Sequence, residues 1–221
     1  MLLPDNSNNT CPLRIAIVGT PRCGNTWLRA MLARLYDATQ IAVHDPKDVN
    51  WNELPDKEYF LQLHWHHTLE FADLLRRNSF RVIVLTRHPL DVLISILHFA
   101  PNEPQTARWL AGEGGSECSI CGKLPISHDF VNYAVGPRAR ALLSISAEWY
   151  SDPNALLVRY ENLVENPQYV LTELIHQIGI PPVENIEVVI SEMTIENLGS
   201  TSTNGHFWKG TPGLWKMVIP H

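Results

Sequence analysis

The turn at residues 19–27, G-T-P-R-C-G-N-T-W, constrains this chain more than any other segment. It follows a short apolar run at residues 15–18 and precedes apolar residues at helical spacing, Leu28, Met31, Leu32 and Leu35. A strand, a glycine turn and the start of a helix together direct backbone N–H groups and the positive end of the helix dipole toward one point. We therefore expect this turn to bind a phosphate-like anion.

The spacing of the turn is Gly-x4-Gly-x-Thr, which differs at one position from the phosphate-binding loop of ATPases and kinases. Asn25 stands where those loops carry a lysine, and the nearest cation is Arg22, three positions earlier. Without that lysine, the loop lacks the group that reaches the β- and γ-phosphates of ATP. The turn is therefore expected to bind an anion without ordinary ATP chemistry.

Composition limits the class of protein further. A chain of 221 residues, 45% hydrophobic and 18% charged, is typical of a globular domain. A net charge of −6 argues against a general nucleic-acid binder, although a local group of cations can still hold a small anion.

No apolar run approaches the roughly 20 residues that span a bilayer, and residues 1–10 do not resemble a signal peptide. The four scattered cysteines do not indicate a disulfide framework, so a cytoplasmic setting is expected.

Strands and helices are predicted to alternate along the chain. Continuous apolar runs predict strands, and apolar residues at helical spacing predict the helices between them. The predicted strands are residues 14–18, 41–43, 59–63, 81–86 and 155–159. The predicted helices are residues 27–36, 68–77, 89–99 and 167–178, the last ended by Gly179. This alternation predicts an α/β fold with a parallel β-sheet flanked by helices on both faces.

The chain is predicted to form one domain over residues 13–221, preceded by a flexible leader at residues 1–12. Residues 101–136 break the alternation because they are rich in Gly, Pro and Ser, with a short helical piece near residues 105–110. We interpret this stretch as a loop-rich insertion near the mouth of the site.

Three further segments carry candidate binding residues. Arg87 ends one predicted strand and Ser95 lies on the helix that follows, while Tyr160 comes directly after another strand. In a parallel α/β sheet, ligands bind at this carboxyl edge of the strands. Residues 207–216, F-W-K-G-T-P-G-L-W-K, form a glycine-containing tail with two lysines and two tryptophans.

These segments together resemble the sulfotransferases that use 3′-phosphoadenosine 5′-phosphosulfate (PAPS). The family motif P-K-S-G-T-T-W matches residues 21–27, and R-x-P-x-D-V-x-x-S matches residues 87–95. The family's Y-E-D segment matches residues 160–162, and its R-K-G-x-x-G-x-W-K tail matches residues 208–216. The motifs occur in the right order over nearly the whole chain. The resemblance implies a P-loop NTPase-like three-layer sandwich.

The resemblance also implies roles for the matching residues. Arg22, the N–H groups of residues 24–26 and the Thr26 hydroxyl would hold the 5′-phosphosulfate. Arg87, Ser95 and Lys209 would hold the 3′-phosphate. Tyr160 and Trp27 would contact the adenine. The donor-binding residues implied in this way are Arg22, Cys23, Gly24, Asn25, Thr26, Trp27, Arg87, Ser95, Tyr160, Trp208, Lys209 and Gly210.

The catalytic residues implied by the resemblance are Arg22 and His64, with no metal ion. His64 would be the general base, because it matches the histidine of the family's K-T-H segment. The chain departs from the family at Gln62 in place of lysine, at Trp208 in place of arginine and at Cys23 in place of serine. It also ends at His221, soon after the tail motif, so its carboxyl end is interpreted as shortened.

Several residues have alternative interpretations. His64, His66 and His67 could form a metal cluster, or His66 could be the base if the strand ends at residue 63. Cys118 and Cys121 have C-x-x-C spacing, which suggests zinc or redox chemistry, or simply two thiols in a loop.

Cys23 at a helix N-terminus is expected to have a lowered pKa, or to serve as a small turn residue. Arg87 could instead pair with Asp91, Ser95 could cap or pack within its helix, and Tyr160 could be a core aromatic. Trp51, Trp65, Trp109 and Trp149 could anchor the core or favour an apolar acceptor.

These motifs and the family resemblance suggest three possible functions. The leading hypothesis is sulfuryl transfer from PAPS to a hydroxyl, or to an amine, of a small-molecule, glycan or lipid acceptor. The alternatives are a nucleotide-dependent small-molecule kinase on the same fold and a donor-binding module without turnover. The sequence contains no pattern that identifies the acceptor or the oligomeric state.

Overall fold

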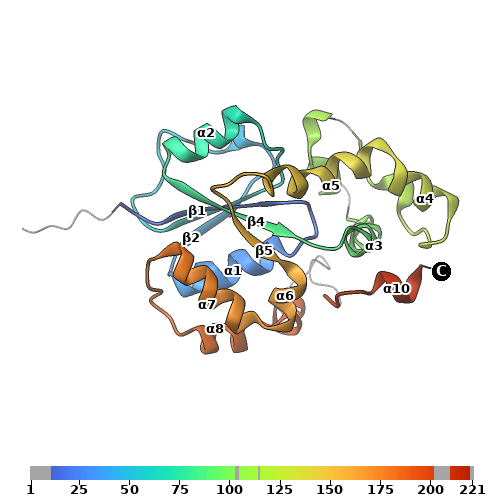
Figure 1. Cartoon of the computed structure of the whole chain (residues 1–221). Coiled ribbons are helices and arrows are strands. Elements are labelled where there is room, and N and C mark those ends of the chain that lie inside the picture. Colours follow the sequence, from blue (N-terminus) through green and yellow to red (C-terminus); the bar gives the residue numbers. More distant parts are fainter. Residues whose placement is uncertain (1–10, 103–104, 114, 202–209, 220–221) are drawn as a thin grey trace, which may run out of the picture.

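The computed structural model of this chain describes residues 11–102, 105–113, 115–201 and 210–219 (Figure 1). Its centre is a five-stranded, fully parallel β-sheet in the order β2-β3-β1-β4-β5. The strands are β1 (Arg14–Gly19), β2 (Thr39–Ala42), β3 (Tyr59–Leu63), β4 (Phe80–Thr86) and β5 (Leu156–Arg159). The predicted α/β fold is confirmed, and each predicted strand is present to within two residues at either end.

The central strand β1 positions the site. It pairs with β3 on one side and β4 on the other, and Ile15 to Val18 are fully buried. The chain leaves β1 toward β2 and later crosses to β4 on the opposite side, so the connections diverge at the carboxyl end of β1. Ligands of doubly wound sheets bind in the crevice at such a point.

Helices cover both faces of the sheet (Figure 1). Helices α2 and α5 pack on one face, and α1 and α7 pack on the other, with α8 beside them. The helices of eight or more residues are α1 (Asn25–Leu35), α2 (Leu69–Arg77), α3 (Pro89–Phe99), α4 (His128–Val135), α5 (Pro137–Trp149) and α7 (Pro167–Ile178). The shorter α-helices are α6 (Tyr160–Glu165), α8 (Ile186–Glu192), α9 (Ile195–Thr201) and α10 (Trp215–Val218).

Local capping explains where the predicted helices begin and end. The Thr68 side chain accepts a hydrogen bond from the Phe71 N–H and caps α2, while Gly179 ends α7 in the left-handed conformation. Pro89 occupies the first turn of α3. Helix α1 begins at Asn25, two residues before its predicted start, so Thr26 already belongs to its first turn.

The stretch predicted to be a loop-rich insertion contains more structure than expected. Its described residues form three short 3-10 helices and helix α4. The buried Glu117 carboxylate accepts hydrogen bonds from the Tyr133 hydroxyl and from Arg138 Nε, each at 3.0 Å. Arg138 Nη2 also donates to the Trp109 carbonyl oxygen at 2.7 Å, and this contact fixes residue 109 against the rest of the domain.

Helix α5, which follows the insertion, was not predicted. Its buried side chains are Ala139, Leu142, Ile145, Ser146 and Trp149, which lie on one face at helical spacing. Ser146 Oγ accepts from the Thr20 N–H at 2.8 Å and donates to the Leu85 carbonyl oxygen at 2.7 Å. Helix α5 therefore joins the carboxyl ends of β1 and β4 beneath the glycine turn.

Within the described part of the chain, every helix is too short or too polar to cross a lipid bilayer.

Candidate functional site

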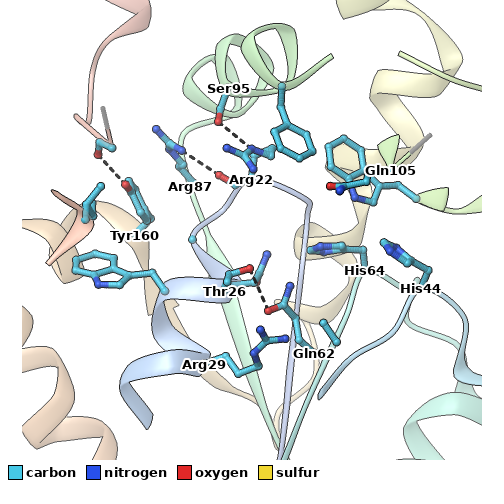
Figure 2. A pocket seen from close by; sticks show the side chains of 18 of the residues that line it. Arg22, Thr26, Arg29, His44, Gln62, His64, Arg87, Ser95, Gln105 and Tyr160 are labelled. Atoms are coloured by element: carbon cyan, nitrogen blue, oxygen red, sulfur yellow. Dashed lines mark hydrogen bonds between the residues drawn. The ribbon is translucent and has the colours of Figure 1, made fainter. Parts of the chain in front are cut away.

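A cavity of about 500 Å³ opens at the carboxyl edge of the sheet, in front of the turn between β1 and α1. Its walls come from that turn, from the ends of β3, β4 and β5, from α3, and from residues 105–109 of the insertion (Figure 2). The described residues that line it are Arg22, Gly24, Asn25, Thr26, Trp27, Arg29, Ala42, His44, Gln62, His64, Arg87, Ser95, Phe99, Gln105, Arg108, Trp109, Tyr160, Ile195 and Gly210.

The charge of this lining is one-sided. It contains arginines and histidines, and no Asp or Glu occurs among the described residues that form it. Arginine side chains gathered without a carboxylate repel one another and lose hydration, so they favour an anion between them. The cavity is therefore electrostatically suited to an anionic ligand even though the whole chain carries a net charge of −6.

The turn that begins α1 has two residues in the left-handed backbone region, Arg22 with φ of 70° and Gly24 with φ of 95°. A Cβ atom at Gly24 would lie 2.6 Å from Tyr160 Cδ2, so glycine is required both by the backbone and by the close ring. Thr26 lies in the first turn of the helix, where backbone N–H groups have no partner within the helix itself. This geometry agrees with the predicted anion-binding turn.

Two arginines lie at the upper end of the cavity in Figure 2 and contact each other through the backbone. Arg87 Nη1 donates to the Arg22 carbonyl oxygen at 2.9 Å, and Arg22 Nε donates to Ser95 Oγ at 3.2 Å. Desolvation, followed by the nearby charge of Arg87, lowers the pKa of Arg22 to about 10, so Arg22 remains a cation at neutral pH. Arg87 Nε is buried without a hydrogen-bond partner.

Aromatic faces support both guanidinium groups. The Arg87 guanidinium carbon lies 4.3 Å from the centroid of the Tyr160 ring, and that of Arg22 lies 4.3 Å from the Phe99 ring. Tyr160 is buried and donates its hydroxyl to the Gly210 carbonyl oxygen at 2.7 Å. Tyr160 therefore acts in the core and lines the cavity at once, which combines two interpretations that the sequence left separate.

Asp91, the alternative partner of Arg87, contacts the backbone of the carboxyl-terminal segment instead. The Asp91 carboxylate accepts from the Gly213 N–H at 2.7 Å and from the Trp215 N–H at 3.0 Å. It thereby attaches the carboxyl-terminal segment to the first turn of α3. Trp27 packs edge-on against Tyr160 and donates Nε1–H to the Met193 carbonyl oxygen at 2.7 Å.

His64 lies just past the end of β3, on the opposite side of the cavity from Tyr160 (Figure 2). Its Nδ1 lies 2.8 Å from the Gly19 carbonyl oxygen, and because a carbonyl only accepts, Nδ1 carries the proton. Nε2 is therefore the unprotonated nitrogen of a neutral ring. Burial lowers the pKa of His64 to about 4, outweighing the Gly19 hydrogen bond, and His44, Arg22 and Arg29 lower it further.

The neighbouring histidines lie elsewhere. Both ring nitrogens of His66 contact carboxylates, Nε2 with Glu113 at 2.8 Å and Nδ1 with Glu148 at 2.9 Å. His67 Nε2 lies 3.3 Å from Asp152 Oδ2, outside the cavity. The three histidines thus contact separate partners, and the described residues contain no group of three or more His, Cys, Asp or Glu side chains placed to hold a metal ion.

The expectation of a lowered Cys23 pKa is wrong. The Cys23 side chain is 1% exposed, and desolvation raises the pKa of its thiol to about 12 despite the nearby charge of Arg87. Its N–H donates to the Thr20 carbonyl oxygen at 3.3 Å, within the turn. Cys23 is a buried turn residue whose side chain lies outside the cavity lining. Cys118 and Cys121 are exposed free thiols in the insertion, also outside the cavity.

Sequence reasoning missed several lining residues. Arg29 lies one helical turn after Asn25 on α1, a spacing that could have placed it beside the loop. His44 and Arg108 come from segments whose sequences have no readable pattern. Of the four tryptophans considered, Trp109 lines the cavity, whereas Trp51, Trp65 and Trp149 pack against the core. Trp208 and Lys209 lie outside the described residues.

The contact between Gly24 and Tyr160 can be tested by adding a single methyl group. We expect Gly24→Ala to lower the free energy of unfolding by about 2 to 4 kcal/mol, because it combines left-handed strain with a clash against a buried ring. Gly122→Ala is the matched control, since Gly122 also has a positive φ of 69° but has nothing within 4 Å of the added Cβ. Urea denaturation measures both. Equal losses in the two variants would show that the ring contact contributes nothing.

The depressed pKa of His64 makes stability depend on pH. The folded state takes up this proton only near pH 4, whereas the unfolded chain takes it up near 6.5, so stability falls as pH drops through that window. We expect His64 to account for about 2 to 3 kcal/mol of lost unfolding free energy between pH 7 and pH 4. Urea denaturation of the wild type and His64→Gln at several pH values measures this loss. The same pH slope in both proteins would contradict it.

Comparison with known proteins agrees with this geometry. Residues 12–216 match the sulfotransferase domain family. Sulfotransferase 6B1 of Mus musculus is 20% identical over 224 residues, which cover 93% of this chain and 70% of the relative.

Two solved structures share the fold. Mouse sulfotransferase SULT7A1 complexed with PAP has a TM-score of 0.68 and 17% identity, covering 94% of this chain and 79% of its own. Retinol dehydratase in complex with androsterone and the inactive cofactor PAP has a TM-score of 0.58 and 14% identity. The match covers 95% of this chain and 78% of the retinol dehydratase chain. Because the family match spans nearly all of the sequence, the chain belongs to the sulfotransferase domain family.

Proposed function

We propose that this protein transfers a sulfuryl group from PAPS to a hydroxyl of a small molecule. One observation carries the proposal. A histidine whose tautomer leaves Nε2 unprotonated faces the same cavity as the arginines of the anion-binding turn, and the described residues that line this cavity include no carboxylate. Family membership and two folds solved with PAP support it.

The cavity fits a donor with two separate anionic groups. Arg22, the N–H groups at the start of α1 and the Thr26 hydroxyl would hold the 5′-phosphosulfate. Arg87 and Ser95 would hold the 3′-phosphate, since Arg87 Nε is buried without a partner and Ser95 Oγ accepts from Arg22, which leaves its proton for a phosphate oxygen. Lys209 and Trp208 belong to the same proposal but lie outside the described residues.

The adenine would lie beside the Trp27 and Tyr160 rings, which meet edge-on at a centroid distance of 6.3 Å. Their places are fixed by the bonds to the Met193 and Gly210 carbonyl oxygens. Two rings held in this way offer faces for a planar base without further loss of side-chain freedom. This end of the cavity is opposite to His64 (Figure 2).

PAPS supplies a sulfuryl group on a good leaving group, so the protein contributes mainly positioning and charge. His64 Nε2 would accept the proton of the acceptor hydroxyl, while the Gly19 carbonyl oxygen keeps the ring in the required tautomer. Arg22 would stay charged throughout and stabilise the negative charge that develops on the phosphate side.

The acceptor would enter on the His64 side, next to Trp109 and Phe99. These two rings are stacked with centroids 5.7 Å apart, and the Trp109 ring meets the His64 ring edge-on at 6.4 Å. An apolar wall beside the base favours an alcohol or phenol with an apolar body. We therefore propose a small-molecule hydroxyl as the acceptor in preference to a glycan or a lipid.

A thermal-shift measurement tests donor binding. We expect 3′,5′-adenosine bisphosphate (PAP) to raise the Tm in the presence of EDTA, because ligand at 100 times its Kd stabilises the folded state by about 2.7 kcal/mol. ATP with Mg²⁺ should produce no comparable shift, since no carboxylate lies among the described lining residues to hold the metal. A shift with ATP and Mg²⁺ alone would support the kinase alternative and contradict the proposal.

A transfer assay tests catalysis. We expect labelled PAPS to modify members of a phenol and alcohol panel, and His64→Ala to lower kcat by about 10² to 10⁴-fold, because the acceptor proton then has no base. The affinity of His64→Ala for PAP should stay within about threefold of the wild-type affinity, since His64 lies at the acceptor end of the cavity. His66→Ala is the matched control for the alternative base.

Undiminished transfer by His64→Ala would remove this residue from its role. Loss of transfer in His66→Ala instead would assign the base to His66. PAPS binding by the wild type without transfer to any acceptor would support the donor-binding module.

A further inference from the structure

Arg29, on the second turn of α1, is a further cation of the cavity. Its Nε donates to Gln40 Oε1 on β2 at 3.0 Å, in an exposed hydrogen bond. Its Nη1 atom, by contrast, is buried and has no hydrogen-bond partner. The guanidinium is therefore held at the surface through Nε, while Nη1 of the same group remains available to a ligand in the cavity that Arg29 lines. A buried donor with no partner costs free energy unless a ligand supplies the missing acceptor.

Among the described residues, no carboxylate forms an ion pair with Arg29. Burial alone lowers the pKa of Arg29, to about 10, and it stays a cation at neutral pH. Arg34, five residues further along the same helix, shows the ordinary arrangement. Its guanidinium pairs with Glu184 at 2.9 Å and with Glu192 at 3.5 Å. A half-buried arginine beside a cavity, with one buried donor and no carboxylate partner among the described residues, is therefore suited to an anionic group of a ligand.

The charges of the cavity divide between its two ends. Burial raises the pKa of Tyr160, and Arg87 and Arg22 oppose that rise. Burial lowers the pKa of His64, and Arg22 and Arg29 lower it further. Arg22 thus acts on both ends, Arg87 on the Tyr160 end and Arg29 on the His64 end. Figure 2 agrees, because it shows Arg29 next to Gln62 and Thr26, away from Arg87 and Tyr160.

The reacting end of the cavity needs a cation at this place. Gln62 is neutral and buried, and its Oε1 accepts from the Thr26 hydroxyl at 3.4 Å, so its side chain brings no charge. In sulfuryl transfer the bond between sulfur and the bridging oxygen breaks, and its electron pair stays on the phosphate oxygen of PAP. A new bond forms between sulfur and the acceptor oxygen, whose proton goes to His64 Nε2. Negative charge thus grows on the bridging oxygen, on the phosphate side that Arg22 would stabilise, and the sulfuryl oxygens need separate donors that keep the group in line for transfer.

We propose that Arg29 is a catalytic residue that donates hydrogen bonds to the sulfuryl oxygens of PAPS and holds that group in line between the bridging oxygen and the acceptor. This inference rests on the proposed function. It concerns the part of the donor that PAP lacks. Arg29 therefore contributes to PAPS binding and to turnover, and PAP affinity is nearly independent of it.

The experiment compares Arg29→Gln and Arg29→Lys with Arg34→Gln, the control on the same helix. We expect Arg29→Gln to lower kcat by about 100-fold, the loss seen when one preorganised donor is removed. PAP affinity should change by less than about threefold, and the preference for PAPS over PAP should fall about tenfold or more. Arg29→Lys should retain more activity than Arg29→Gln, and Arg34→Gln should match the wild type in all of these measurements.

A double variant tests whether charge at this place is what matters. In the Arg29→Gln background, Gln62→Lys brings an ammonium group to the neighbouring side chain (Figure 2). We expect this double variant to recover at least about tenfold of the lost kcat. A purely structural role of Arg29, as a tether to Gln40, predicts instead that Gln40→Ala lowers Tm as much as Arg29→Gln does and that Gln62→Lys recovers nothing.

Each outcome separates this inference from the proposed function. Wild-type kcat and an unchanged preference for PAPS in Arg29→Gln would overturn the inference and leave the proposed function standing. If the wild type binds PAPS but transfers to no acceptor, the proposed function fails. The binding preference of the variants then still decides whether Arg29 contacts the sulfuryl group. Loss of PAP and PAPS affinity in equal measure would also overturn the inference.

Discussion

The contact between the Tyr160 ring and Gly24 is the constraint on which the rest of the site depends. The absence of a Cβ at position 24 lets the ring lie where a methyl group would be 2.6 Å from Cδ2. The ring face then supports the Arg87 guanidinium, and the hydroxyl holds the Gly210 carbonyl oxygen. Arg87 in turn donates to the carbonyl oxygen of Arg22. One close approach thus connects the turn, the end of β4 and the carboxyl-terminal segment.

The same contacts allow cations to gather in a lining whose described residues include no carboxylate. Two guanidinium groups lie over aromatic faces at 4.3 Å, and each donates to a neutral oxygen, the Arg22 carbonyl or the Ser95 hydroxyl. The nearby carboxylate of Asp91 is occupied by two backbone N–H groups. Its charge is therefore used to attach the carboxyl-terminal segment, and it forms no part of the cavity lining. The arginines keep their full charge for a ligand.

Sequence patterns predicted the sheet well and the insertion poorly. Strands β1, β3 and β4 are mostly apolar and largely buried, so their sequences alone identify them. Helix α4 and the 3-10 helices of the insertion depend on the buried Glu117 and its bonds to Tyr133 and Arg138, which are long-range contacts that no local pattern reveals. Helix α5 does have a helical pattern, at Leu142, Ile145 and Trp149, which the sequence prediction did not include.

The turn and the strand-end positions of Arg87 and Tyr160 were predicted from sheet geometry, because these positions meet at one edge of a parallel sheet, whereas the role of His64 came from the family resemblance. Arg22, Arg87, Ser95, Tyr160 and His64 indeed line one cavity. The Cys23 prediction failed because helix dipole and neighbouring charge were weighed without burial, and burial dominates the pKa of that thiol. Burial depends on how α5 packs under the turn, which is a tertiary property.

The cations that would hold the donor also help to keep the proposed base, His64, unprotonated. Burial, His44, Arg22 and Arg29 all lower the pKa of His64, so the ring is neutral with Nε2 free of a proton throughout the physiological range. A base of low pKa accepts a proton less readily, which slows transfer in proportion to its basicity. Binding a donor with several negative charges would offset the arginine charges and raise this pKa. His64 would thus be a stronger base when the donor is present than when the cavity is empty, which links proton acceptance to donor binding.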